Sequence, residues 1–334
     1  MRNSASTPGT ARSSRRRGRD MAVRLWGPGA GPLVLRSFVA AIGCLAACDR
    51  PVPGPTTAPI GRRLVCSFLP VYVFTLNVVG KVPGFDVQLM LPPTAGCPHD
   101  YELTSADARR ISQADVLIFS GGLEVFAGDA ARRLNPRALQ IEAWRGCDLI
   151  AAECDDHHES HAHSVNPHVW LSPRQAIRQV RNIADGLSMA YPEHAATFRD
   201  QASAYVDRLE ALSAEVERAR VRLSGRAIVT THDAFAYLAR DLDLRVVATL
   251  SIAPGREPSP AHLAGVVRLI RRFRVPVVFS ESGTDPRVAE LVAREAGVPV
   301  RELDAIVTAT APPSADYYER RMASNLHVLS ESLK

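Results

Sequence analysis

The stretch Asn166-Pro167-His168-Val169-Trp170-Leu171-Ser172-Pro173 stands between two halves of the chain that share one pattern. In each half, short runs rich in β-branched residues alternate with longer amphipathic runs, as in α/β domains. Ser172 suits a helix N-cap and Pro173 the first helical position, so we expect a helix over residues 172–191. No Gly/Ser-rich linker separates the halves. The sequence therefore predicts two α/β lobes joined by one helix.

Eight strands are expected, four in each lobe, and they cover residues 64–68, 86–91, 115–119, 139–142, 227–231, 245–250, 275–280 and 298–302. Thr104-Ser105-Ala106-Asp107 resembles a capping box and opens a helix through Ser112. Apolar residues at helical spacing predict another helix between Pro192 and Leu223. We accordingly place the first lobe at 63–171, the connecting helix at 172–191 and the second lobe at 192–334.

The N-terminus has the features of an export signal. Residues 1–47 hold eight arginines and one acidic residue, and a short apolar stretch ends in Leu45-Ala46-Ala47-Cys48. This order is typical of a secretory leader, for which Met21 is an alternative start. The last four residues resemble a bacterial lipobox, so we expect a lipidated Cys48 followed by a proline-rich tether over residues 48–62. The alternative is an ordinary leader with an incidental cysteine.

The formal charge of +5 comes from this leader. Without residues 1–47, the total of 40 basic and 35 acidic residues falls to 32 and 34, so the remainder is near −2. A nucleic-acid-binding surface needs a basic patch on the folded part, and this composition predicts none. We therefore expect no nucleic-acid partner.

Three histidines and one aspartate are the strongest candidates for a metal site. His232 and Asp304 each follow an expected strand, His168 lies just before the connecting helix, and His99 follows a proline-rich turn. Ligands bind at the carboxyl ends of strands in open α/β sheets, so two candidates from each lobe would meet in the cleft between the lobes. Three neutral imidazoles and one carboxylate satisfy a four-coordinate ion such as Zn(II). We expect the affinity to fall below about pH 6.5, because protonated imidazole binds no metal.

A second group of histidines lies in the run of residues 155–163 and comprises His157, His158, His161 and His163. A run so rich in histidine and acidic residues predicts an exposed loop, and such tracts bind metal weakly in interchangeable geometries. We expect an auxiliary metal-collecting loop. An accidental polar loop is the alternative.

Four further cysteines follow the tether, an even number that suits an oxidising compartment. Their expected pairing is Cys66 with Cys97 and Cys147 with Cys154, although the sequence does not determine connectivity. The alternative makes Cys97, two residues from His99, a thiolate near the metal.

Several motifs resemble segments of the zinc- and manganese-binding lipoproteins of ABC transporters. They are Pro92-Pro93-Thr94-Ala95-Gly96-Cys97-Pro98-His99-Asp100-Tyr101-Glu102, residues 166–173, Thr231-His232-Asp233-Ala234-Phe235-Ala236-Tyr237-Leu238, and Glu257-Pro258-Ser259-Pro260 with Leu263. Leu303-Asp304 and the closing run 318–333 resemble the family's last ligand and terminal helix. The resemblance covers about residues 63–333.

The resemblance implies two Rossmann-like lobes joined by one rigid helix, with metal held between them by His99, His168, His232 and Asp304. His232 stands where manganese members typically have Glu, which favours zinc. The implied protein is a monomeric receptor, not an enzyme, in the periplasm or cell envelope. It would be held to the membrane by its lipid and would deliver Zn(II) to the inner-membrane permease of an ABC importer.

Three alternatives remain. A receptor of the same family could carry Mn(II), because affinity order alone does not decide loading in the cell. A secreted zinc hydrolase would need an open coordination position and a general base, for which Glu281 and Glu102 are candidates. An adhesin or zinc buffer would lack the transporter.

Overall fold

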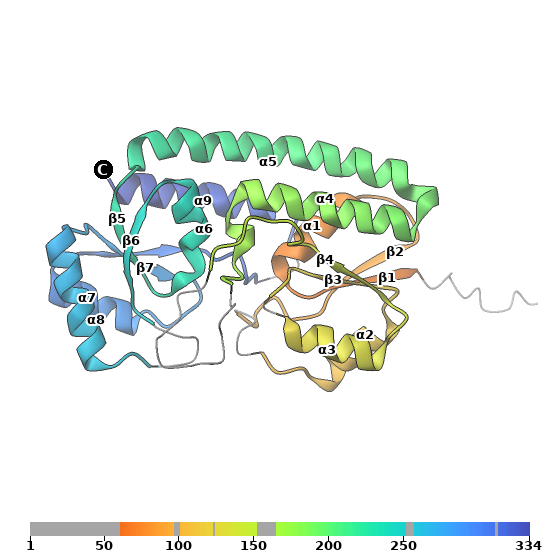
Figure 1. The fold of residues 1–334 in the computed structure, drawn as a ribbon, viewed down its shortest axis with the longest axis horizontal. Helices are drawn as coiled ribbons and strands as arrows, with labels where there is room; N and C mark the ends of the chain where they lie inside the picture. Colours follow the sequence, from red (N-terminus) through yellow and green to blue (C-terminus); the bar gives the residue numbers. More distant parts are fainter. Residues whose placement is uncertain (1–60, 97–100, 123, 152–164, 252–256, 311–312) are drawn as a thin grey trace, which may run out of the picture. The chain divides into compact units, whose positions relative to one another are not determined.

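The computed structural model describes residues 61–96, 101–122, 124–151, 165–251, 257–310 and 313–334. The described residues belong to one compact unit and contain two four-stranded parallel sheets (Figure 1). The first sheet has the order β2-β1-β3-β4, with β1 Arg62–Cys66, β2 Phe85–Leu89, β3 Val116–Phe119 and β4 Leu139–Glu142. The second has the order β6-β5-β7-β8, with β5 Ala227–Thr230, β6 Arg245–Thr249, β7 Val278–Glu281 and β8 Val300–Leu303. The expected α/β class with two lobes is confirmed.

Helices cover these sheets as in doubly wound folds. In chain order they are α1 Leu69–Val79, α2 Ser105–Gln113, α3 Val125–Leu134, α4 Pro173–Ala190, α5 Ala195–Leu223, α6 Ala236–Asp241, α7 Pro260–Phe273, α8 Arg287–Ala296 and α9 Tyr317–Ser332. None of the helices in the described ranges is long and apolar enough to cross a membrane. The expected leader and Cys48 lie outside the described residues.

Local sequence signals place two of these helices as expected. The Thr104 hydroxyl accepts from the backbone N–H of Asp107, and the Asp107 carboxylate accepts from the N–H of Thr104, so the capping box of α2 is complete. Ser172 caps α4 by accepting from the N–H of Gln175. The Ser172 hydroxyl also donates to the buried carboxylate of Asp241, which ties the start of α4 to α6 in the second lobe.

The connection between the lobes uses two antiparallel helices. α4 runs along the first lobe, and α5 returns beside it and continues over the second lobe (Figure 1). With 29 residues, α5 is about 44 Å long. The helix expected over residues 172–191 is therefore present as α4, but the chain reaches the second lobe through α5. The exact lobe boundaries stay a prediction.

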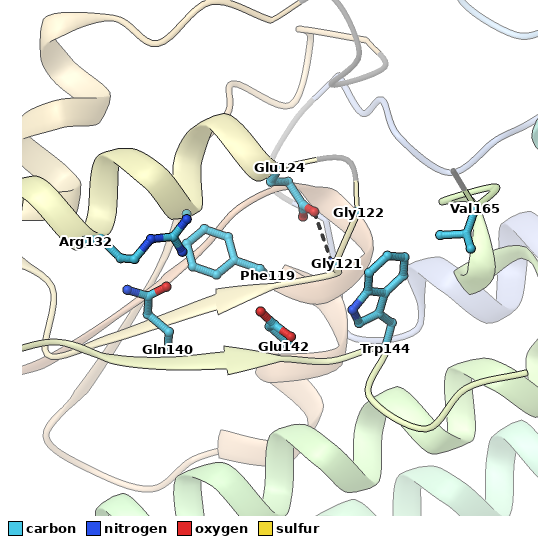
Figure 2. Close-up of a pocket in the computed structure, with 10 residues that line it drawn as sticks. Phe119, Gly121, Gly122, Glu124, Arg132, Gln140, Glu142, Trp144 and Val165 are labelled. Atoms are coloured by element: carbon cyan, nitrogen blue, oxygen red, sulfur yellow. Dashed lines mark hydrogen bonds between the residues drawn. The ribbon is translucent and has the colours of Figure 1, made fainter. Parts of the chain in front are cut away.

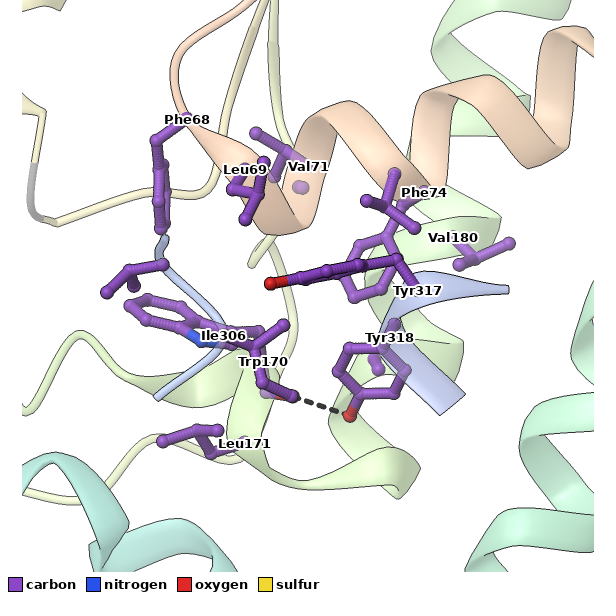
Figure 3. Packing of buried hydrophobic residues seen from close by; sticks show 14 of the residues in the cluster. Phe68, Leu69, Val71, Phe74, Trp170, Leu171, Val180, Ile306, Tyr317 and Tyr318 are labelled. Atoms are coloured by element: carbon purple, nitrogen blue, oxygen red, sulfur yellow. Dashed lines mark hydrogen bonds between the residues drawn. The ribbon is translucent and has the colours of Figure 1, made fainter. Parts of the chain in front are cut away.

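The hydrophobic core is continuous across this connection. One buried cluster includes residues of β1, α1, α4, α5 and α9, and a smaller cluster lies around α7 and α8. Trp170, which is fully buried, lies among Phe68, Ile306 and Tyr318 (Figure 3). Its indole N–H donates to the carbonyl of Ala305 at 2.8 Å, and its own carbonyl accepts from the Tyr318 hydroxyl at 2.7 Å. Trp170 thus contacts Phe68 of the first lobe with its ring, and it binds Ala305 and Tyr318 of the second lobe through its indole N–H and its backbone carbonyl.

We expect Tyr318→Phe to destabilise the protein by about 1–2 kcal/mol, because it removes a buried donor to the Trp170 carbonyl while leaving the ring in place. Urea unfolding of the metal-free protein measures this change. Tyr191→Phe, at a half-buried position at the end of α4, is the matched control and should cost less. Equal losses of unfolding free energy in both variants would show that the hydrogen bond from Tyr318 to the Trp170 carbonyl adds no stability beyond that of a half-buried tyrosine hydroxyl.

Candidate metal centre

The second sheet places three polar side chains at the carboxyl ends of neighbouring strands. His232 follows β5, Glu281 ends β7 and Asp304 follows β8, and these strands are adjacent in the order β5-β7-β8. β5 and β7 flank the point where the strand order reverses, which is where ligands bind in folds of this kind. The sequence predicted His232 and Asp304 here. It did not predict that Glu281 would lie between them.

His168 reaches the same region from the loop before α4. The side chain is buried, and its Nδ1 lies 3.0 Å from Oδ1 of Asn166. The amide nitrogen of Asn166 donates to the backbone oxygen and the carboxylate of Asp233, at 2.8 and 3.0 Å. Since that nitrogen is engaged, Oδ1 must be the acceptor and Nδ1 of His168 the donor. In this tautomer the lone pair lies on Nε2, which is the nitrogen that a metal would bind.

His232 has a matching arrangement with a carboxylate. Its Nδ1 lies 3.0 Å from Oε2 of Glu281, whose side chain is 3 % exposed. A ligand imidazole in a metal site commonly donates its other N–H to a carboxylate, which fixes the ring and its tautomer. The rings of His168 and His232 are 5.3 Å apart between centroids, at 72° to each other. Two imidazoles are therefore held close together with Nδ1 engaged in both.

Burial controls the charge of the His232–Glu281 pair. Burial lowers the pKa of His232 to about 4, and burial followed by the charge of Asp304 raises the pKa of Glu281 to about 7. Both shifts favour the neutral forms, so below about pH 7 the contact is a neutral hydrogen bond rather than an ion pair. His232 stays unprotonated down to about pH 4, so the loss of affinity expected below pH 6.5 does not come from this ring.

Asp304 is held by the backbone around it. Its Oδ1 accepts from the N–H of Ile306 at 2.7 Å, and its Oδ2 lies 3.3 Å from Nε of Arg321 on α9. Asn325 fixes the backbone of Asp304 by accepting from its N–H and donating to its carbonyl. Burial raises the pKa of Asp304, while the Ile306 hydrogen bond and the charge of Arg321 oppose that rise. The carboxylate is thus positioned, with its charge partly offset by Arg321.

The described residues contain only part of the predicted ligand set. His168 and His232 lie together and Asp304 stands near Glu281, but no group of three or more His, Cys, Asp or Glu side chains among the described residues is close enough to hold a metal. His99 lies outside the described residues. The histidines of the auxiliary loop, His157, His158, His161 and His163, lie outside them as well. The four-ligand site therefore stays a prediction.

A separate cavity of about 420 Å³ lies in the first lobe (Figure 2). It is lined by residues that include Gly121, Glu124, Arg132, Glu142 and Trp144, and it contains none of the expected ligands. The Glu124 carboxylate accepts from the Ser67 hydroxyl and from the N–H groups of Ser120 and Gly121, so it organises this loop. Gly121 has φ 113°, and a Cβ there would strike the Trp144 ring at 2.3 Å.

The cysteines give no support to a thiolate ligand among the described residues. Cys66 and Cys147 are free thiols in the structure, and burial raises their pKa values to about 12 and about 11. Their expected partners, Cys97 and Cys154, lie outside the described residues. Both disulfides, and the alternative of Cys97 beside the metal, stay predictions.

Two functional residues were missed or misread from the sequence. Asn166 was read only as part of a motif, and its place two residues before His168 was the available signal. Glu281 was considered only as a general base of a hydrolase. Its position at the end of a strand was visible, but the strand order that brings it beside His232 was not.

Comparison with known proteins identifies the family. Residues 64–332 match the family model described as zinc-uptake complex component A, periplasmic. The chain is 31 % identical over 281 residues to the zinc-binding lipoprotein AdcA of Streptococcus pneumoniae, covering 81 % of this chain and 55 % of that protein. It therefore spans about half the length of the AdcA relatives that it matches.

Two further relatives match over nearly their whole length. The high-affinity zinc uptake system protein ZnuA of Bacillus subtilis is 28 % identical over 301 residues, covering 86 % of this chain and 93 % of that protein. Among solved structures, FpvC of Pseudomonas aeruginosa in complex with Mn²⁺ has a TM-score of 0.70 at 32 % identity, covering 82 % of this chain and 98 % of that one. These relatives are described as metal-binding and uptake proteins, which leaves the hydrolase alternative without support.

His232 and Glu281 contribute to the stability of the metal-free protein with opposite dependences on pH. Because His232 binds its proton less readily when folded, its contribution grows as pH rises from about 4 to 6.5. Because Glu281 binds its proton more readily when folded, its contribution is lost as pH rises from about 4.5 to 7. Between about pH 4.5 and 6.5 these two trends largely cancel.

We therefore expect the free energy of unfolding of Glu281→Gln, relative to the wild type, to increase by about 3 kcal/mol from pH 4.5 to 7.5. Urea unfolding of the metal-free proteins across this range measures the difference. Glu302→Gln, at an exposed position of β8, is the control that removes one carboxylate from the same sheet. A pH-independent difference for Glu281→Gln would refute the assigned burial effect.

Proposed function

Because the chain belongs to the family of periplasmic zinc-uptake components, we propose that it is an exported receptor that binds Zn(II) between its two lobes and delivers it to an ABC importer. The observation that carries this proposal is the His168–His232 pair. Each ring has Nδ1 engaged by an oxygen, from Asn166 and Glu281 respectively, and the rings are 5.3 Å apart. Such second contacts set the tautomer and orientation that zinc ligands need.

The proposed ligand set is His99, His168, His232 and Asp304. Three imidazoles and one carboxylate suit borderline-soft Zn(II), whereas Mn(II) prefers oxygen ligands. Mn(II) is the second candidate, because the related FpvC has been solved with Mn²⁺. The metal is cargo, so the site has to bind it tightly and also release it when the importer distorts the ligand arrangement.

The proposed location follows from the leader and the lipobox-like run before Cys48. In this proposal Cys48 carries lipid, residues 49–60 tether the folded part to the membrane, and the permease of the importer is the protein partner. The receptor acts as a monomer. No residue of the site has a catalytic role, and Glu281 is assigned the positioning of His232 in place of the general-base role.

We expect His168→Ala and His232→Ala each to lower zinc affinity at least a hundredfold, because each removes one of four ligands and leaves a buried gap in the site. Metal content of purified protein and competition with a chromophoric chelator measure the loss. His262→Ala is the matched control, since the His262 ring contacts the Thr249 carbonyl and His262 is not one of the proposed ligands. Unchanged affinity in both site variants would overturn the ligand assignment.

We expect the auxiliary loop to change the number of weakly bound zinc ions and not the affinity of the principal site. Ala151 and Val165, which flank the segment that carries the histidines, pair as an antiparallel bridge. The two ends of this segment therefore lie side by side, directly before Asn166. We expect deletion of residues 155–163 to remove additional weak zinc binding and to leave one tightly bound ion per chain. Calorimetric titration measures both classes of sites.

A variant with His157, His158, His161 and His163 replaced by Gln keeps the loop length and serves as the control for the deletion. Its titration should match that of the deletion. If either variant abolished all binding while His232→Ala did nothing, the principal site would lie in the loop.

A further inference from the structure

Tyr237 on α6 joins two irregular segments of the chain beside the candidate metal centre. Its side chain is fully buried. The hydroxyl donates to the carbonyl of Asn166 at 2.6 Å and accepts from the N–H of Ile150 at 3.0 Å. The N–H of Asn166 in turn donates to the carbonyl of Ile150 at 2.8 Å. Because a phenol has one hydrogen to donate, these partners use the hydroxyl both as a donor and as an acceptor.

Asn166 is the residue that orients His168. Its Oδ1 accepts from the backbone N–H of His168 at 3.0 Å and lies 3.0 Å from Nδ1 of the ring. Its amide nitrogen donates to Asp233, and its backbone groups bind Ile150 and Tyr237. Each polar group of Asn166 therefore has a partner. A side chain that is itself fixed in this way holds a neighbouring imidazole in one orientation.

The groups that hold Asn166 come from the part of the chain that carries the other proposed ligand. Asp233 directly follows His232, and Tyr237 lies shortly after it on α6. One short stretch of the second lobe thus presents the His232 ring and also binds the residue that orients the His168 ring. The separation of the two rings, 5.3 Å between centroids, is therefore set in part by these contacts.

A buried tyrosine hydroxyl needs hydrogen-bonding partners in any protein, and that requirement explains its two bonds in part. A second contact already attaches residues 148–150 to α6. Arg240 donates to the Asp148 carbonyl at 3.2 Å, forms an ion pair with its carboxylate at 3.1 Å and stacks on the Tyr237 ring at 5.2 Å. Trp170 anchors the chain after His168 separately. What the hydroxyl adds is a contact at the residue that orients the His168 ring.

We infer that Tyr237 is a positioning residue of the metal centre, whose hydroxyl acts through Asn166 to hold the His168 ring in the orientation that zinc needs. The inference rests on the proposed function, because it takes His168 as a ligand. Without the hydroxyl, the Asn166 carbonyl loses a buried hydrogen bond, and the Asn166 side chain can shift with its backbone. Metal binding then has to order the His168 ring, and this ordering lowers the affinity.

Tyr237→Phe tests this role, because it removes the hydroxyl and keeps the ring. We expect it to weaken zinc binding by about 10- to 100-fold, measured on the purified protein by competition with a chromophoric chelator. Tyr205→Phe is the matched control, since Tyr205 is also a buried tyrosine and its hydroxyl contacts Glu319 at 3.5 Å. We expect this control to keep the zinc affinity of the wild type. Equal weakening in both variants would overturn the inference.

Hydrogen exchange in the metal-free protein separates positioning from general destabilisation. We expect the Nδ1–H of His168 to exchange with solvent faster in Tyr237→Phe than in the wild type, as followed by NMR. The indole N–H of Trp170 is the internal reference, because it is buried nearby and donates to Ala305 independently of Tyr237. Equal acceleration at both groups, or no acceleration at His168, would contradict a positioning role.

The His168→Ala background separates the role of Tyr237 from the role of His168 as a ligand. There we expect Tyr237→Phe to cause no further loss of zinc affinity, because the ring that it positions is absent. A further loss as large as that in the wild type would show that Tyr237 does not act through His168. Unchanged zinc affinity in His168→Ala, with faster exchange at His168 in Tyr237→Phe, would count against the proposed ligand set and not against the positioning of the ring.

Discussion

The burial of Trp170 is the constraint on which the rest of the structure depends. Its indole donates to Ala305 at the end of the second sheet, its carbonyl accepts from Tyr318 on α9, and its ring meets Phe68 edge-on at 4.9 Å. The same residue lies two positions after His168, whose ring is 5.3 Å from the indole. The side chain that joins the lobes therefore also sets the position of a proposed ligand. A large movement of one lobe against the other would have to break this packing.

The candidate metal centre follows from strand order. His232, Glu281 and Asp304 come from three parts of the chain, and the order β5-β7-β8 aligns their strand ends. The low polarity around His232 and Glu281 explains the shifted pKa values of both side chains, since burial disfavours both charged forms. A site built this way presents neutral imidazoles to a metal at neutral pH. The same burial makes the empty site costly, because buried polar groups lose their hydration.

Local sequence signals predicted the regular elements well, and the reason is visible in particular residues. All eight expected strands exist, with bounds that differ from the expected ones by at most three residues, and the caps at Thr104 and Ser172 form as expected. These signals act between residues that are close along the chain, so they can be recognised without knowledge of the tertiary contacts. The connection between the lobes was harder to predict, because only the packing of α5 against α4 shows that α5 leads the chain to the second lobe. His168 and His232 were predicted to meet and do, whereas the meeting of Asp304 with His99 stays a prediction.

By itself, the sequence determined the α/β class, the division into two lobes, the family resemblance and the identity of the candidate ligands. It did so because β-branched runs, helix caps and short motifs are encoded by neighbouring residues. Tertiary structure alone decided that Asn166 and Glu281 orient the two imidazoles and that Trp170 joins the lobes. Each of these depends on residues that are distant along the chain, and their proximity is created only when parallel strands and antiparallel helices pack together.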